Sequence, residues 1–279
     1  MRALVHPYPS GLPSRGSAAE LSDDELVAFY TPPAGSTQGA GSASHRPWVR
    51  FNFVSSADGA ATLDGHSRGL GTAADRRLFA LLRRPADVIL VGAGTLRVEG
   101  YAGELVSAED RAWREDRGLP GHPGIAVVSG SLGLDPDGEF LRTAPVRPLV
   151  LTTAGADAGR RRAIEEVADV VDCGERRAEP ARISAELAGR GHRLVHSEGG
   201  PALFGTFAAA GLADELCLSL SPLAAGPSGI RIMGGPGLPE AAALDLVGLL
   251  EEDGALFLRY VFPRHEPRRA ADADGVRAS

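Results

Sequence analysis

The apolar residues of the chain fall into short runs separated by segments with helical spacing. Runs of β-compatible apolar residues predict buried strands at 48–54, 87–92, 125–129, 149–152, 170–171, 194–195 and 215–220. Helical spacing predicts helices after Ser22, after Thr72, at 158–166, at 183–190 and from Pro201. Asp253-Gly254, between apolar segments at 244–251 and 255–262, predicts a C-terminal hairpin. This alternation of strands and helices indicates an α/β fold, a mixed, mostly parallel sheet with helices on both faces.

Changes in composition divide the chain into an N-terminal arm at 1–45, a main domain at 46–263 and a tail at 264–279. The arm begins with an irregular stretch rich in Pro, Gly and Ser over residues 1–17. It contains one short helix, introduced by the capping-box pattern after Ser22, and ends in a flexible linker. The tail, with its alternating charges and alanines, is expected to be disordered.

Composition narrows the possible functions. Of 279 residues, 43% are hydrophobic, which is enough for a sizeable core. No apolar run approaches the ~20 residues of a membrane helix, and the first residues lack a secretory apolar stretch, so we expect a cytoplasmic protein. The net charge of −7 argues against nucleic acid as the main partner. All basic residues apart from histidine are arginines, which excludes chemistry that needs a P-loop or Schiff-base lysine.

Several common catalytic sites lack their sequence signature. Cys173 and Cys217 lie in apolar, strand-like segments, which indicates small buried residues instead of a disulfide. No cluster of Cys and His has metal-ligand spacing, so we expect no metal site. Ser55, Ser56 and Ser197 lack the Gly-x-Ser-x-Gly context of a hydrolase nucleophile.

Two glycine-rich stretches look like dinucleotide-binding fingerprints but lack the required context. Gly69–Ala74 follows a polar loop instead of a strand. Gly92–Arg97 follows a strand, but its arginine stands where close helix–strand packing needs a small residue. A standard Rossmann site is therefore not expected, although a Gly-x-Gly-Thr turn after a buried strand can still approach a nucleotide.

The stretch Arg193–Leu212 gives the strongest signal of a ligand site. A short strand breaks at Gly199-Gly200 and a helix resumes at Pro201, where proline is pre-set for helical φ. The two glycines permit close backbone approach, and a helix N-terminus suits a phosphate or pyrophosphate. Glu198 follows the strand, where ligands of open α/β sheets bind. Taken alone, a purely structural turn is equally consistent with Gly-Gly-Pro.

Further polar residues are predicted at the same edge of the sheet. The carboxylates that follow predicted strands or lie close by are Asp58, Asp64, Glu99 and Glu198, and the histidines that could face them are His66 and His196. Singly each carboxylate is expected on the solvated surface, but together they indicate a cleft.

Three motifs, in order and at similar spacing, carry a resemblance to a known family. They are Ser56–Gly59, Asp87–Thr95, and Glu198–Pro201 followed by Ala209–Leu216 and Ser221-Pro222. From about Trp48 to Phe262, the chain resembles the reductase domain of bacterial riboflavin biosynthesis. That domain is a pyrimidine reductase of the dihydrofolate reductase-like superfamily, so the resemblance implies a dihydrofolate reductase-like sheet.

The resemblance implies a homodimeric NADPH-dependent enzyme that reduces a ribosylaminopyrimidine 5′-phosphate, as 5-amino-6-(5-phosphoribosylamino)uracil reductase does. It implies cofactor contacts from Ser56, Thr95, Glu99, Ser129, Gly199, Gly200, Pro201, Ala202, Leu203, Phe204, Gly205 and Thr206. It implies a substrate pocket lined by Ser67, Arg83 and Glu198. Asp58 would stand beside the reacting carbon, where Asp58 or Glu198 would stabilise developing positive charge.

The sequence differs from the family pattern at the residue that binds the substrate phosphate. The family has Asp-Asp-Pro and then a substrate-contacting arginine after its strand-end threonine, but Arg97–Leu105 holds no arginine at the matching place. Either Arg68 or Arg97 replaces it, or the natural substrate lacks a phosphate at that place. Replacement is the favoured alternative, because both arginines lie on loops predicted to rim the pocket. Two other functions stay open, a reductase of another pterin-like or secondary-metabolite heterocycle and a non-catalytic nucleotide-binding protein of the same fold. The first 45 residues lack the zinc ligands of the family's deaminase partner.

Overall fold

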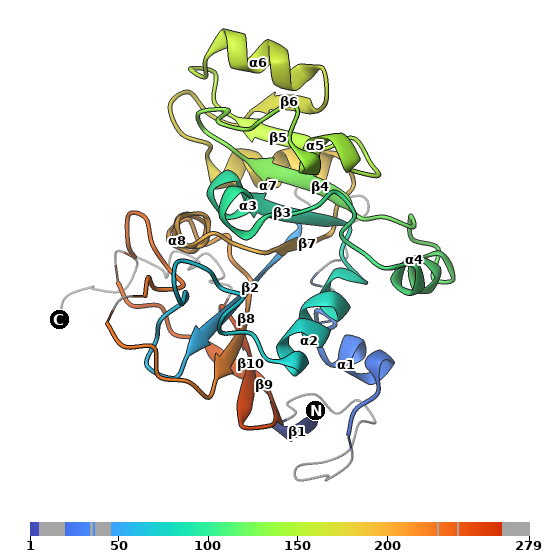
Figure 1. Ribbon diagram of the computed structural model, residues 1–279, viewed down its shortest axis with the longest axis vertical. Coiled ribbons are helices and arrows are strands. Elements are labelled where there is room, and N and C mark those ends of the chain that lie inside the picture. Colours follow the sequence, from blue (N-terminus) through green and yellow to red (C-terminus); the bar gives the residue numbers. More distant parts are fainter. Residues whose placement is uncertain (6–19, 34–35, 37–45, 228, 239, 264–279) are drawn as a thin grey trace, which may run out of the picture.

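The computed structural model describes residues 1–5, 20–33, 36, 46–227, 229–238 and 240–263 (Figure 1). Its strands are β1 (Arg2–Val5), β2 (Trp48–Ser56), β3 (Val88–Gly92), β4 (Gly124–Val128), β5 (Leu149–Thr152), β6 (Asp169–Asp172), β7 (Leu194–Ser197), β8 (Glu215–Ser221), β9 (Asp245–Glu252) and β10 (Ala255–Val261). Within the described residues they form one ten-stranded sheet in the order β1-β9-β10-β8-β2-β7-β3-β4-β5-β6. The sheet runs the length of the molecule, from β6 at the top of Figure 1 to β1 beside the N-terminus.

The larger part of the sheet is parallel. β8, β2, β7, β3, β4, β5 and β6 pair in parallel, each with its neighbour in the sheet. β10, β9 and β1 extend the β8 end in antiparallel pairing, and β9 and β10 form the hairpin predicted around Asp253-Gly254. The predicted mixed, mostly parallel α/β sheet with a C-terminal hairpin is confirmed.

Helices pack on both faces of the sheet. They are α1 (Asp23–Phe29), α2 (Ala73–Arg83), α3 (Ala93–Glu99), α4 (Ala108–Glu115), α5 (Glu139–Thr143), α6 (Ala158–Glu165), α7 (Pro180–Gly189) and α8 (Pro201–Ala209). Successive residues of β3 enter different cores, because side chains alternate along a strand. Leu90 packs in one core with Ile183 of α7 and Phe204 of α8. Ile89 packs in another core with Ile164 of α6. Burial on both faces explains why this strand is apolar throughout.

Helices α3, α4 and α5 are absent from the sequence prediction. α3 begins directly at the end of β3, in a Gly-Ala-Gly-Thr segment that resembles a turn. α5 has 5 residues, too few for a visible period. α4 does have a signal, because Ser107 and Asp110 form a capping box like the one that starts α1.

The N-terminal arm contributes to the sheet and to the core. The sequence predicts irregular structure over residues 1–17, but Arg2–Val5 pair with β9, so this prediction is wrong for the strand. The helix after Ser22 is confirmed as α1, with both bonds of its capping box. Leu26 and Phe29 of α1 are buried in a core that also contains residues of α2.

Three buried charged side chains tie α1 to the sheet. Glu215 of β8 accepts hydrogen bonds from Arg50 Nε at 3.0 Å and Arg259 Nε at 2.8 Å. Arg259 Nη1 donates to Phe29 O at 2.5 Å, and Arg50 Nη2 donates to Tyr30 O, both at the end of α1. Buried charges need such pairing, because an unpaired charge costs several kcal/mol. The arm therefore packs on the domain through paired charges and hydrogen bonds as well as apolar contacts, although Arg50 Nη1 and the Tyr30 hydroxyl have no hydrogen-bond partner among the described residues.

The linker expected at 35–44, apart from Ser36, and the disordered tail expected at 264–279 lie outside the described residues. The expected division into an arm at 1–45, a domain at 46–263 and a tail therefore stays a prediction. In the part of the chain that is described, no helix is long and apolar enough to cross a membrane.

Candidate active site

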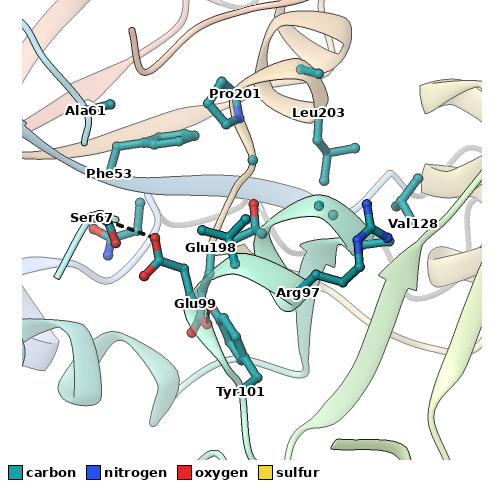
Figure 2. A pocket seen from close by; sticks show the side chains of 18 of the residues that line it. Phe53, Ala61, Ser67, Arg97, Glu99, Tyr101, Val128, Glu198, Pro201 and Leu203 are labelled. Atoms are coloured by element: carbon teal, nitrogen blue, oxygen red, sulfur yellow. Dashed lines mark hydrogen bonds between the residues drawn. The ribbon is translucent and has the colours of Figure 1, made fainter. Parts of the chain in front are cut away.

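A cavity of about 1090 Å³ lies at the carboxyl ends of the parallel strands. Phe53 of β2, Gly92 of β3 and Val128 of β4 line it at the strand ends, together with residues of α2, α3 and α8. Figure 2 shows these walls around Glu198, which directly follows β7. This is the edge of an open α/β sheet at which ligands generally bind.

Both carboxylate oxygens of Glu198 are engaged by neighbouring side chains. Arg83 of α2 donates from Nε to Oε1 at 2.5 Å and from Nη2 to Oε2 at 2.8 Å. The Tyr101 hydroxyl donates to Oε2 at 2.8 Å. Such a bidentate guanidinium–carboxylate pair fixes the orientation of both side chains and is stronger than a hydrogen bond between neutral groups. The structure therefore brings the expected Arg83 and Glu198 together and adds Tyr101, which the sequence analysis does not identify.

The protonation states of this cluster are set by burial and by pairing. Burial raises the pKa of Glu198, but the charge and hydrogen bonds of Arg83 outweigh it and lower that pKa, so Glu198 is ionised. His196 Nε2 lies 3.8 Å from Glu198 Oε1, and neither ring nitrogen has a hydrogen-bond partner among the described residues. Burial lowers the pKa of His196 to about 3, so this histidine is neutral beneath the cavity.

The Gly199-Gly200 turn brings the backbone close to α3. The N–H of Gly92 donates to Gly199 O at 2.8 Å. A Cβ atom on Gly200 would lie 2.6 Å from Thr95 Oγ1, too close for any real contact. A side chain at position 200 would therefore have to displace Thr95 or the turn, because the turn and α3 are packed directly together.

The N-terminus of α8 faces this cavity without a cap. Its first residue is Pro201, and no side chain in the described part of the chain accepts from its first turn. Ala202 and Leu203, which follow, line the cavity. First-turn N–H groups have no partner inside a helix, and the positive end of the dipole adds to their attraction for an anion. The predicted anion site therefore has uncapped donors beside the cavity.

Ser67 and Glu99 meet on one side of the cavity. The Ser67 N–H donates to Glu99 Oε1 at 2.9 Å, the dashed line in Figure 2. Glu99 Oε2 has no protein partner among the described residues. The resemblance assigns Ser67 to the substrate and Glu99 to the cofactor, and the structure places the two side by side.

The two candidate replacement arginines point to different parts of the cavity. Arg68 lines it next to Ser67, and its guanidinium has no partner within the described residues. Arg97 Nη1 donates to Gly133 O at 2.9 Å. Figure 2 shows Arg97 extending toward Val128, away from Ser67. Ser129, expected near the adenosine, also lines the cavity beyond β4.

Asp58 and Ser56 do not line the cavity, so the structure does not bring Asp58 to Glu198. Asp58 is exposed and accepts hydrogen bonds from the Ser56 hydroxyl, from Ala225 N at 3.0 Å and from Gly226 N at 2.7 Å. These bonds, that of Ser56 first, lower its pKa to about 2. The observed contacts of Asp58 hold two loops together, and its catalytic role is a prediction without support from this geometry.

Other expected site residues divide between cavity and core. Those that line the cavity are Thr95, Gly200, Pro201, Ala202, Leu203 and Thr206, whereas Gly199, Phe204 and Gly205 do not. Phe204 is fully buried, with its ring 4.8 Å from that of Phe51. Phe204 packs in the core, and Gly205 packs against the backbone of Gly234, so neither faces the cavity. Asp64 and His66 also lie outside the cavity lining.

Comparison with known proteins agrees with this arrangement. The RibD C-terminal domain matches residues 47–255. The 2,5-diamino-6-ribosylamino-4(3H)-pyrimidinone 5′-phosphate reductase of Archaeoglobus fulgidus is 28% identical over 179 residues, 64% of this chain and 81% of the relative. The enzyme of that name from Methanothermobacter thermautotrophicus is 28% identical over 201 residues, 71% of this chain and 88% of the relative.

A solved structure extends the similarity to the fold. The pyrimidine reductase-like protein of Corynebacterium diphtheriae is 26% identical, with a TM-score of 0.74, over 88% of this chain and 100% of that one. The resemblance seen in the sequence motifs is therefore confirmed. The chain belongs to the RibD C-terminal domain family and is a reductase of the pyrimidine reductase type.

Proposed function

We propose that the chain is an NADPH-dependent reductase of a ribosylaminopyrimidine 5′-phosphate in riboflavin biosynthesis. The observation that carries this proposal is one continuous cavity. It extends from the Arg83–Glu198–Tyr101 cluster, past the uncapped start of α8, to Ser129 at the end of β4. A cytoplasmic homodimer is part of the same proposal, on the ground of the family resemblance.

The cavity fits a dinucleotide. The uncapped donors of Ala202 and Leu203 suit a pyrophosphate, and the Gly200 turn allows the backbone to approach it. Ser129 lines the cavity at the end of β4, where the family resemblance puts the adenosine, and Phe53 lines it at the end of β2. NADPH, when bound, supplies the hydride, while the protein provides binding, orientation and electrostatics.

The substrate end is held rigid by paired charges. The negative charge of Glu198 is already balanced by the guanidinium of Arg83. Its carboxylate therefore orients Arg83 and Tyr101 and is not available as a counter-charge for the substrate. Reduction of an imine-like carbon builds positive charge that a carboxylate stabilises. Glu99, with one oxygen free beside Ser67, fits that role better than Asp58.

The phosphate of the substrate is assigned to Arg68. Arg97 is bonded to Gly133 O and lies toward Val128, whereas Arg68 lies beside Ser67 with its guanidinium unpaired in the described structure. An arginine–phosphate pair is geometrically demanding, so an arginine at the wrong end of the cavity cannot substitute.

Steady-state kinetics with phosphorylated and dephosphorylated ribosylaminopyrimidine test this proposal. Wild type should prefer the phosphorylated form, and Arg68→Ala should lose about tenfold or more of that preference in kcat/KM, on the scale of one charge-assisted hydrogen bond. Arg97→Ala is the matched control and should retain the preference. If wild type shows none, another heterocycle becomes the better substrate. NADPH binding without turnover on a broad heterocycle panel would leave a nucleotide-binding protein.

A further inference from the structure

The end of the cavity farthest from Ser67 contains arginines that the reduction itself does not use. Arg176 and Arg177, from the loop between β6 and α7, line the cavity together with Ser129 and Ser131 from the end of β4. Arg97 of α3 extends toward the same side, near Val128 (Figure 2). These residues, apart from Val128, are called the distal end below.

The loop that carries Arg176 and Arg177 has a fixed backbone. Glu179 N donates to Cys173 O at 2.7 Å and closes the loop on itself. Ala154 N donates to Gly174 O at 2.8 Å, which ties the loop to the segment that follows β5. The two arginines are therefore presented to the cavity by an anchored turn.

Charge is distributed unevenly along the cavity. The carboxylates that line it come from α2, from α3 and the segment after it, and from the end of β7. They are Asp75, Glu99, Glu104 and Glu198. No carboxylate among the described lining residues comes from the distal loops. The nearby Glu179 pairs with Arg182 at 3.3 Å. Arg176 and Arg177 are exposed and have no ion pair or hydrogen bond through their guanidinium groups within the described residues.

Two unpaired guanidinium groups on one anchored turn suit a dianionic phosphomonoester. Guanidinium binds phosphate through parallel hydrogen bonds, which makes arginine a specific phosphate ligand. Ser129 and Ser131 line the same cavity beyond the start of α8, so a dinucleotide with its pyrophosphate at α8 can extend its adenosine ribose toward them. The difference between NADPH and NADH is one phosphomonoester on that ribose.

We propose that Arg176 and Arg177 bind the 2′-phosphate of NADPH and thereby make the enzyme discriminate against NADH. This assignment rests on the proposed function, because it places the cofactor along the same cavity. Arg97 is not a principal ligand, since its guanidinium already donates to Gly133 O.

The test measures equilibrium binding of NADPH, NADH, 2′,5′-ADP and 5′-AMP to the full-length protein by isothermal titration calorimetry. Wild type should bind NADPH more tightly than NADH, and 2′,5′-ADP more tightly than 5′-AMP. Arg176→Ala and Arg177→Ala should each weaken NADPH about tenfold, the scale of one exposed charge-assisted hydrogen bond. The affinities for NADH and 5′-AMP should change less than about threefold, because neither molecule carries a 2′-phosphate.

Arg162→Ala is the matched control, because Arg162 is an exposed arginine of α6 that does not line the cavity and belongs to no ion pair within the described residues. It should leave all four affinities unchanged. If the Arg176→Ala/Arg177→Ala double variant keeps the wild-type ratio of NADPH to NADH affinity, or if wild type does not distinguish them, the arginine assignment is overturned while the reductase proposal stands. If wild type binds neither dinucleotide, both fail.

Discussion

Replacing Gly200 by alanine tests where the cofactor pyrophosphate lies. The backbone of Gly200 has φ −89° and ψ −175°, an extended conformation that alanine adopts freely. The added Cβ would lie 2.6 Å from Thr95 Oγ1, so either the turn or the side chain of Thr95 must move. The substitution therefore acts through one contact and leaves intrinsic backbone strain nearly unchanged.

The expected cost follows from the donors that the turn positions. A hydrogen bond to a charged group contributes roughly 1.5–3 kcal/mol. Loss of one such bond at the start of α8 corresponds to a rise in the NADPH dissociation constant of roughly ten- to 150-fold. Calorimetric titration of NADPH measures this directly. Gly189→Ala in α7 is the control, because a Cβ there meets nothing within 4 Å and Gly189 does not line the cavity.

A double-mutant cycle identifies the cause. Thr95→Ala removes Oγ1, and the next-nearest atom to a Cβ at Gly200 is Thr95 Cβ at 3.9 Å, an ordinary contact. The combined variant should therefore bind NADPH better than the two single losses predict. If Gly200→Ala folds normally and its NADPH affinity equals that of wild type, the placement of the pyrophosphate at this turn is refuted.

Two more predictions concern the cluster around Glu198. Tyr101→Phe removes a 2.8 Å hydrogen bond to the paired carboxylate of Glu198. The value of kcat/KM should fall about tenfold, which corresponds to a loss of about 1.4 kcal/mol of transition-state stabilisation, with little change in melting temperature. An unchanged kcat/KM would show that Tyr101 contributes only to packing. Burial lowers the pKa of His196 from 6.5 to about 3, so the unfolded chain binds this proton first as pH falls. Stability should decrease below about pH 6.5, by up to about 1.4 kcal/mol per pH unit from this residue, and His196→Gln should reduce the slope in denaturant titrations between pH 6.5 and 5. Identical slopes would contradict the assignment.

The features that sequence patterns predict here are local. Apolar runs and caps placed most strands and the helices at Thr72 and Pro201, because each signal lies within a few residues of the element it specifies. The Gly-Gly-Pro turn was recognisable for the same reason. The edge strand Arg2–Val5 was not, because its pairing partner lies at residues 249–251. Four residues carry no period that could identify such a strand.

Side-chain roles were harder to predict than elements. Asp58 follows a strand, as a catalytic carboxylate would, but Ala225 and Gly226, 167 and 168 residues further along, take its oxygens out of the cavity. Tyr101 and Glu198 meet across 97 residues, so neither sequence neighbourhood indicates the contact. Position along a strand predicts which edge of the sheet a residue occupies. The loops that close over that edge decide where its side chain points.

The missing family arginine and the presence of Tyr101 belong to one physical arrangement. Glu198 is already balanced by Arg83, and the Tyr101 hydroxyl adds a donor without adding charge. A cation for the substrate phosphate must then come from elsewhere on this side of the cavity, and Arg68 is unpaired there within the described structure. The substrate phosphate is therefore expected beside Ser67, at the opposite end of the cavity from the distal arginines. With the two anion sites separated in this way, each can be removed by mutation without altering the other, so the residues that bind the substrate phosphate and the cofactor phosphate can be tested separately.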